Sequence, residues 1–435
     1  MSTTVERPKS VTNFALNLIG PAVALVAMYV LRTMHRSGPE AVFIVCVAGV
    51  VPIVLIDVLL LRVHRRETTG LDWDKQVTSD VPRVATKLLG LAATIAPIAL
   101  AYFVFPEYGS WYTPFYALIR RFWAGLVACA VAYTWIVDGM MREPRDAYWQ
   151  IGRALLGHQE DVNGADIANH ARSWLIKAFY LPIFVVYTLN QIDGMLTFDF
   201  ARFGGVADMR LYHFSSDAIY ALDVLYATVG YVLSFRIIDT HVRSAEPTLL
   251  GWAVALECYT PFWGGLFSRL YLHYEGPGFE SWLSGHLGLQ WAWAGAILLC
   301  EFIYLLATFA FGVRFSNLTH RGILTGGPYR FTKHPAYVAK NISWWLVTVP
   351  FIPTHAGWVD TIKWCLCMAG VNFIYYMRAR TEERHLSRDP TYVQYALWMN
   401  EHGALRWFGR ISLFGVHPFR YTPPATETST AHRSR

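Results

Sequence analysis

Charged residues are scarce in this chain of 435 residues: they make up 16% of it, whereas hydrophobic residues make up 54%. With a mean hydropathy of +0.29, this composition is not that of soluble globular domains and predicts a polytopic integral membrane protein of the all-α class. The formal net charge is +6, but the cations are scattered between apolar runs and form no stripe. We therefore expect no nucleic-acid partner.

Cysteine is also sparse, and its six positions lie inside apolar stretches with no CxxC pair and no zinc-type spacing to histidine. This pattern predicts neither disulfides nor a metal site. The first apolar run lacks a small-residue cleavage site, so we expect a retained span and not a signal peptide. The tail over 411–435 is rich in Thr, Ser and Pro toward its end, which predicts disorder.

Long apolar runs predict about ten membrane-spanning helices, because about twenty helical residues cross a bilayer's hydrocarbon core. They lie near 12–32, 41–62, 86–105, 119–138, 173–190, 217–237, 248–268, 290–313, 336–350 and 360–379. The seventh run is interrupted by Pro261 and by Gly264 and Gly265. The ninth would be only about 22 Å long at 1.5 Å per residue.

Cations concentrate in alternate loops, as the positive-inside rule expects for loops that face the cytoplasm. These cations are Arg62, Arg65, Arg66, Lys75, Arg142, Arg145, Arg153, Arg236, Arg243, Arg314, Arg321, Arg330 and Lys333. With an even number of spans, both termini and the segment 326–337 are expected on that side.

Two features between the spans have competing interpretations. Four acids lie within apolar runs, where each must pair, face a polar cavity or stay protonated: Asp57, Asp223, Glu257 and Glu301. They are candidates for a substrate tunnel, but a hydrogen bond between helices is the favoured interpretation. The polar segment 139–172 is compatible with an interfacial helix near Trp149, although a solvated connector is preferred.

Chemistry-bearing residues gather in two short segments near the C-terminus. The first is 326–337, in which Gly326, Gly327 and Pro328 predict a turn and Pro335 predicts a helix start. The first-turn N–H groups of such a helix favour an anion, and Arg330, Lys333 and His334 add cationic or donor groups. The aromatic residues Tyr329, Phe331 and Tyr337 offer ring faces to a purine or a sulfonium cation.

The second segment is 382–386, at the end of a long helix that is expected to leave the bilayer after the last span. Glu382 and Glu383 can accept hydrogen bonds from ribose hydroxyls and offset an ammonium charge. Considered alone, this pair is ordinary helix surface, with Arg378 spaced to pair with Glu382 at i,i+4. The hypothesis of a site depends on both segments meeting at the ends of a helical hairpin.

The motif order resembles the isoprenylcysteine carboxyl methyltransferase and phospholipid methyltransferase superfamily. It runs Gly-Pro-Tyr-Arg, two residues, Lys-His-Pro-Ala-Tyr, two spans and Glu-Glu-Arg-His-Leu, followed by Tyr392 and Tyr395, within 290–405. The resemblance implies an integral-membrane enzyme that transfers a methyl group from S-adenosyl-L-methionine to a lipid or prenylated acceptor. It implies cofactor contacts by Gly327, Pro328, Tyr329, His334, Pro335, Tyr337, Glu382 and Glu383. Catalytic roles would fall to His334, Lys333 and Arg330, with His334 as the base for an amine acceptor.

Two positions depart from the family pattern. Lys333 stands where the family has Arg, which keeps the charge but loses the planar fork for a carboxylate. Ala339 stands where the family has Gly. The long N-terminal part exceeds the family's common size, so we divide the chain into a multi-span region (1–285), a methyltransferase-like region (286–410) and the tail (411–435).

Two alternatives stay open at this point. An NADPH-dependent sterol-type reductase resembles the same hairpin, but its pattern has Asn-Tyr after the His and an acid after the Gly, where this chain has Pro335-Ala336-Tyr337 and Ala339-Lys340. A non-catalytic transporter or sensor is suggested by the large N-terminal region with its four intramembrane acids.

Overall fold

The computed structural model describes residues 6–74, 78–105, 109–202, 209–264, 274, 276–353, 357–412, 417 and 419–423. The described chain is mostly helical and contains one antiparallel pair of two-residue strands, β1 (Ser244–Ala245) and β2 (Thr319–His320). The helices are α1 (Phe14–Asn17), α2 (Ile19–Thr33), α3 (Pro39–Leu55), α4 (Val81–Val104), α5 (Thr113–Met140), α6 (Ala147–Leu155), α7 (Gly164–Thr197), α8 (Arg210–Val232), α9 (Leu249–Leu256), α10 (Phe279–Trp282), α11 (Leu287–Phe311), α12 (Pro335–Thr348), α13 (Trp358–Leu386) and α14 (Pro390–His402). The expected all-α class is confirmed.

Six helical stretches in the described part of the chain are long and apolar enough to cross a membrane. They are Phe14–Thr33, Pro39–Leu60, Val81–Val104, Ser110–Met140, Gly164–Thr197 and Leu287–Arg314. None of the residues in the most apolar window of the fourth stretch is buried within the protein. An apolar surface of that size is stable only when another apolar phase covers it, so these helices support the expected multi-pass membrane protein.

The expected count of about ten spans is not confirmed. The run near 248–268 is not one continuous helix, because α9 ends at Leu256 and the missing N–H of Pro261 cannot extend a helical ladder. Its last residues, 265–268, lie outside the described part. Helix α12 has 14 residues, about 21 Å at 1.5 Å per residue, which is shorter than a hydrocarbon core.

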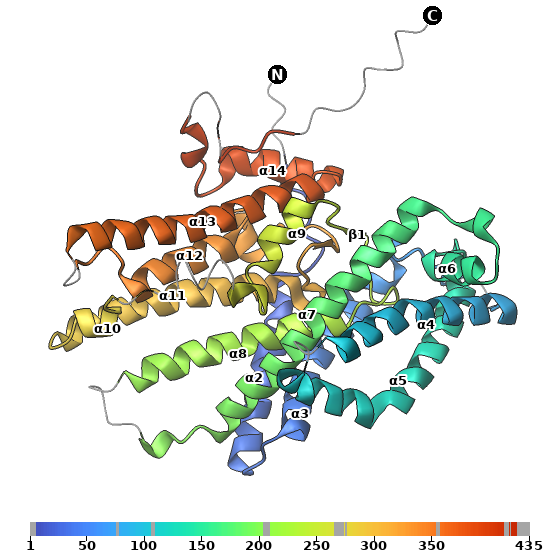
Figure 1. Cartoon of the computed structure of the whole chain (residues 1–435), viewed down its shortest axis with the longest axis horizontal. Helices are drawn as coiled ribbons and strands as arrows, with labels where there is room; N and C mark the ends of the chain where they lie inside the picture. The colour runs from blue at the N-terminus through green and yellow to red at the C-terminus, as the bar shows by residue number, and fades with distance from the viewer. Residues whose placement is uncertain are drawn as a thin grey trace, which may run out of the picture.

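Helices α8, α11, α12 and α13 run alongside one another and frame the region of the two motif segments (Figure 1). The apolar core that supports them joins α2, α3, α7, α8 and α11. Asp223 of α8 accepts hydrogen bonds from Tyr304 Oη at 2.5 Å and Thr308 Oγ1 at 2.6 Å, both on α11. For this acid the favoured interpretation, a bond between helices, is confirmed.

The segment 139–172 is more structured than a solvated connector, so that preference was wrong. Asp146 caps α6 by accepting from the N–H of Trp149, and α6 packs across α4. A Cβ on Gly90 of α4 would lie 1.9 Å from the carbonyl oxygen of Tyr148, so only glycine permits this close approach. The polar pattern was misleading because Gln150 is buried and Asp146 Oδ2 lies 3.5 Å from Lys87 Nζ of α4.

The first described residues pack against the C-terminal motif region. The N–H of Val11 donates to the Ile323 carbonyl at 2.9 Å, Thr325 Oγ1 donates to the Pro8 carbonyl at 2.7 Å, and Thr12 Oγ1 donates to the Ala310 carbonyl at 2.7 Å. Within the segment expected to be a tail, Tyr421 is buried and its N–H donates to Asn400 Oδ1 at 3.0 Å. Residues 424–435 lie outside the described part.

Candidate functional site

The two motif segments are shaped as the sequence predicts, with one difference in position. Gly327 to Arg330 form a 3₁₀ turn, but residues 312–326 separate this turn from the end of α11, so it does not lie directly at the helix exit. Gly327 has φ +57° and a Cβ there would lie 2.6 Å from the ring of Phe14, so only glycine fits. Pro335 begins α12, and α13 runs unbroken past Glu383, as expected.

Glu383 joins the start of α12 to the end of α13. Its Oε1 lies 3.1 Å from His334 Nε2 and 2.5 Å from Lys333 Nζ. Arg380 Nη1 donates to the second oxygen, Oε2, at 3.0 Å. Because Glu383 is buried and bound on both oxygens, it positions the His-Pro segment.

Glu382 lies near the other ring nitrogen of the same histidine, with its Oε2 3.9 Å from His334 Nδ1. Its side chain is 41% exposed, and its Oε2 accepts a hydrogen bond from Tyr337 Oη at 2.8 Å. Among the described residues no ion pair joins it to Arg378, so the i,i+4 surface pair is wrong. Arg378 is buried instead, donates to Asn317 Oδ1 at 2.6 Å and lies 5.1 Å from the centre of the Tyr337 ring.

These groups surround an open-sided hollow whose empty space is ≈ 970 Å³ when the open solvent at its mouth is included. Its wall comes from α11, the 315–319 loop, the start of α12 and the end of α13. A second hollow of ≈ 620 Å³ shares Tyr329, His334 and Glu382 with it and is also lined by Val11. Polar and aromatic side chains that line the first hollow include Glu246, Tyr304, Lys333, His334, Tyr337, Lys340, Tyr375, Arg378, Glu382 and His385.

The nominated residues occupy different places around this wall. Tyr329, Lys333, His334, Tyr337 and Glu382 line it, whereas Gly327, Pro328, Pro335 and Glu383 are not part of the lining. The guanidinium of Arg330 is not part of it either: the residue is exposed and lies 5.4 Å from the ring centre of Phe331. The structure therefore brings together His334, Lys333, Tyr337, Glu382 and Glu383.

Sequence reasoning missed several wall residues. Lys340 follows Tyr337 by three positions on α12, and Tyr375 and Arg378 precede Glu382 by seven and four positions on α13. Such spacings place side chains on one helix face, so the helical period was the signal that would have found them. His385 follows Glu382 by three positions and carries the same signal, whereas Tyr304 lies on α11, outside both motif segments.

No family model, curated protein or solved structure matches this chain. What the hollow does therefore has to be inferred from its side chains. The motif order within 290–405 remains the reason to expect the methyltransferase superfamily.

Two acid–base groups at the site have shifted pKa values. Burial alone would raise the pKa of Glu383, but the hydrogen bond with His334 and the charge of Lys333 outweigh it and lower this pKa to about 2. Burial lowers the pKa of His385 to about 4, and the positive charges of His320, Arg388 and Arg172 act in the same direction. His385 is therefore neutral at neutral pH, with its Nε2 2.9 Å from Ser244 Oγ.

This shift predicts a pH dependence of stability. The folded pKa of His385, about 4, lies below the unfolded value of 6.5, so between these values the unfolded chain binds the proton and stability falls as pH drops. The shift corresponds to about 3 kcal/mol when fully developed. Thermal unfolding in detergent should show this loss between pH 6.5 and 4, and His385→Gln should remove much of it. An unchanged slope in that variant would contradict the assignment.

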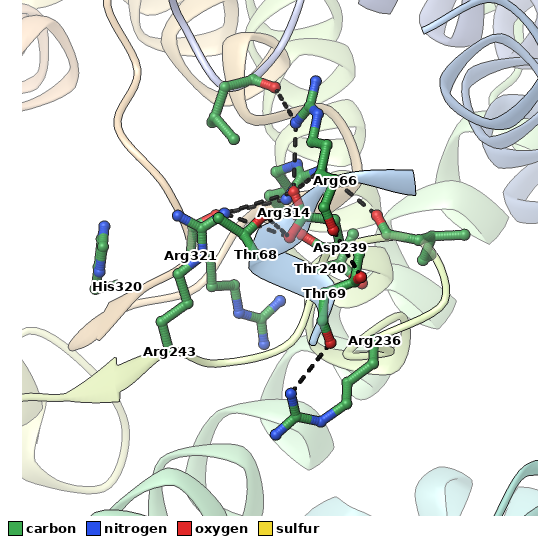
Figure 2. A network of polar contacts seen from close by, with 12 residues as sticks. Arg66, Thr68, Thr69, Arg236, Asp239, Thr240, Arg243, Arg314, His320 and Arg321 are labelled. Carbon is green, nitrogen blue, oxygen red and sulfur yellow. Dashed lines mark hydrogen bonds and ion pairs between the residues drawn. The ribbon is translucent and has the colours of Figure 1, made fainter. Parts of the chain in front are cut away.

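Behind the second hollow lies a cluster of arginines around one aspartate, which we call the Asp239 cluster (Figure 2). Asp239 is fully buried, and its Oδ2 lies 3.3 Å from Arg66 Nη1 and 3.4 Å from Arg314 Nη2. Its Oδ1 lies 3.3 Å from Arg243 Nη2 and accepts a hydrogen bond from Thr68 at 2.8 Å. Because Arg314 also lines the second hollow, the cluster holds three loops together beneath the site.

Proposed function

We propose that this chain is an integral-membrane methyltransferase that uses S-adenosyl-L-methionine and acts on a lipophilic acceptor. One observation carries the proposal: the His-Pro helix start and the Glu-Glu helix end converge on one hollow. His334 Nε2 lies 3.1 Å from Glu383 Oε1, and Tyr337 Oη lies 2.8 Å from Glu382 Oε2. The superfamily resemblance pairs these same two segments at its cofactor site.

The donor set of the wall fits this cofactor. Glu382 is partly exposed and keeps acceptor capacity for ribose hydroxyls beyond its bond from Tyr337. The rings of His334 and Tyr337 are stacked, with centres 5.4 Å apart, and Tyr375 lies edge-on to Tyr337 at 5.6 Å. Aromatic faces of this kind attract a sulfonium cation and pack against a purine.

When bound, S-adenosyl-L-methionine supplies a methyl group that is already activated by its positive sulfur. The chain's own residues then have to hold the acceptor atom in line with the bond between the sulfur and the methyl group, and to exclude water. Glu383 contributes by fixing the His-Pro segment, and His334 is placed to take a proton if the acceptor is an amine. A carboxylate or thiolate acceptor needs no such base.

A membrane location suits this reaction. The hollow is bounded by α11, whose sequence is apolar enough to cross a bilayer. A lipophilic acceptor can therefore approach from the lipid, while a water-soluble donor enters from the side on which the cationic loops lie. We assign that side to the cytoplasm, together with both termini, because positively charged loops are retained there.

The test is equilibrium binding of S-adenosyl-L-methionine to the purified full chain in detergent. We expect Glu382→Ala and His334→Ala each to weaken binding by at least about tenfold, since a hydrogen bond to a charged group contributes about 1.5–3 kcal/mol. Glu401→Ala, an exposed acid on α14, is the matched control and should leave the affinity unchanged. Unchanged affinity in both site variants would contradict the proposal.

The same assay separates the alternatives. NADPH should not compete with the methyl donor, and competition by NADPH would favour the reductase. Incubation of the protein with a lipid extract and a radiolabelled methyl donor should label the extract. Absence of both labelling and donor binding would leave the transporter or sensor as the better interpretation.

A further inference from the structure

Two cations line the hollow and form no ion pair with a carboxylate in the part of the chain that the structure describes. Among the described residues, the ammonium of Lys340 makes no hydrogen bond or ion pair, and it lies 5.2 Å from the ring centre of Tyr304 and 5.6 Å from that of Trp344. Arg378 bonds to the amide of Asn317 and lies over the rings of Tyr337 and Tyr259. Ring faces offset only part of the cost of removing a cation from water.

The neighbouring acids are already engaged. Asp223 is the carboxylate that acts most on Lys340, but its two oxygens accept hydrogen bonds from Tyr304 and Thr308. Glu382 accepts from Tyr337, and Glu246, elsewhere on the wall, accepts from both Thr248 N and Thr248 Oγ1 through Oε1.

Lys333, the third cation of the wall, has a partner. Its Nζ lies 2.5 Å from Glu383 Oε1, so it is neutralised by the bond that holds the His-Pro segment. The sequence predicted that Lys333 attracts an anion, but Lys340 and Arg378 are better placed to do so, because they have no such partner among the described residues. Lys340 and Arg378 line the same hollow and the positive charge of Arg378 acts on Lys340, so an anion bound near both would relieve repulsion as well as desolvation.

We propose that Lys340 and Arg378 form a binding site for a carboxylate group of a ligand in this hollow. Among the described residues neither Lys340 nor Arg378 forms an ion pair with a carboxylate, so a carboxylate of a ligand would supply the missing partner. The carboxylate belongs either to the amino-acid end of the methyl donor or to the acceptor. The inference rests on the proposed function for this choice of ligands, and the two sources give different results below.

Binding is measured with two pairs of probes on the full chain in nanodiscs. S-adenosyl-L-methionine is compared with decarboxylated S-adenosylmethionine, and oleate with oleyl alcohol. In one pair, Lys340→Met should lower the affinity for the probe that carries the carboxylate by about tenfold. The affinity for the probe without it should stay within twofold, because only the carboxylate loses a charged contact. Selective loss of S-adenosyl-L-methionine assigns the carboxylate to the donor, and selective loss of oleate assigns it to the acceptor.

Three variants complete the experiment. Lys340→Arg keeps the charge and should retain most of the discrimination. Lys363→Met removes a lysine that also lies over a tryptophan ring, 4.3 Å from the centre of Trp364, but outside the hollow, so it should change nothing. Arg378→Gln should reduce the same carboxylate probe as Lys340→Met, with thermal unfolding used to check that each variant is folded.

Equal binding of both members of each pair in folded wild type, or equal weakening of all four probes by Lys340→Met, would overturn the carboxylate site. Failure of the wild type to bind S-adenosyl-L-methionine, with selective loss of oleate in Lys340→Met, would overturn methyl transfer and keep the carboxylate site. If the wild type binds S-adenosyl-L-methionine and Lys340→Met changes the binding of no probe, the carboxylate site would be overturned and methyl transfer kept.

Discussion

Replacing Asp239 with alanine should lower the free energy of unfolding by about 3–5 kcal/mol, the usual effect of removing one partner of a buried ion pair. Arg66, Arg243 and Arg314 all approach its carboxylate within 3.3–3.4 Å. Without it, these guanidinium groups repel one another in a space where Asp239 itself is fully buried. Denaturant titration in detergent micelles measures the change.

The chain offers a matched control for this prediction. Asp74 also pairs with an arginine, but its side chain is 91% exposed and its Oδ1 lies 3.9 Å from Arg65 Nη1. Asp74→Ala should therefore change the free energy of unfolding by less than about 1 kcal/mol. If Asp239→Ala were as mild as Asp74→Ala, the cluster would not hold the loops together.

The second large effect is expected from Glu383→Gln, which keeps the shape of the side chain and removes its charge. The lowered pKa of about 2, against an ordinary value of 4.5, corresponds to about 3 kcal/mol of stability. That stability is present above pH 4.5 and is lost as pH falls toward 2, because the unfolded chain then binds the proton first. At neutral pH the variant should lose about this amount, since Lys333 remains without its partner.

Glu382→Gln is the natural comparison, one position earlier on the same helix. Its carboxylate is partly exposed and accepts from Tyr337, so we expect a loss of donor affinity with less than about 1 kcal/mol change in stability. The double variant Lys333→Met with Glu383→Gln should recover part of the loss, as coupled neighbours do in a double-mutant cycle. Additive losses would mean that the 2.5 Å contact between them contributes no coupling.

The sequence could predict those parts of the site that depend on local chemistry. Proline at position 335 begins α12 because its missing N–H is not needed in a first turn, and α13 continues as one helix from Trp358 past Glu383, as the sequence predicted. The meeting of the two segments followed from the helices expected between them. Only one of the two adjacent glutamates, Glu382, lines the hollow. Which of them does so depends on the rotation of α13 about its own axis, and the Glu-Glu pair alone does not reveal that rotation.

The Asp239 cluster shows what local patterns do not contain. Arg66, Arg243 and Arg314 come from three segments that are remote in sequence, and each separately resembles the cationic flank of a membrane span. The positive-inside pattern assigned them to orientation, because it counts charges and not their partners. The expected count of about ten spans is not confirmed: α9 and α12 lie in apolar runs, yet α9 ends at Leu256 and α12 at Thr348.

The packing of the first described residues onto the motif region has a consequence for biosynthesis. Thr12 and Ala310, which share a hydrogen bond, are 298 positions apart, so the N-terminal residues emerge from the ribosome long before their partners exist. Val11 lines the second hollow, and this wall is therefore closed only after nearly the whole chain has been made. Folding during translation therefore ends with a step in which the N-terminal residues pack against segments that are synthesised late.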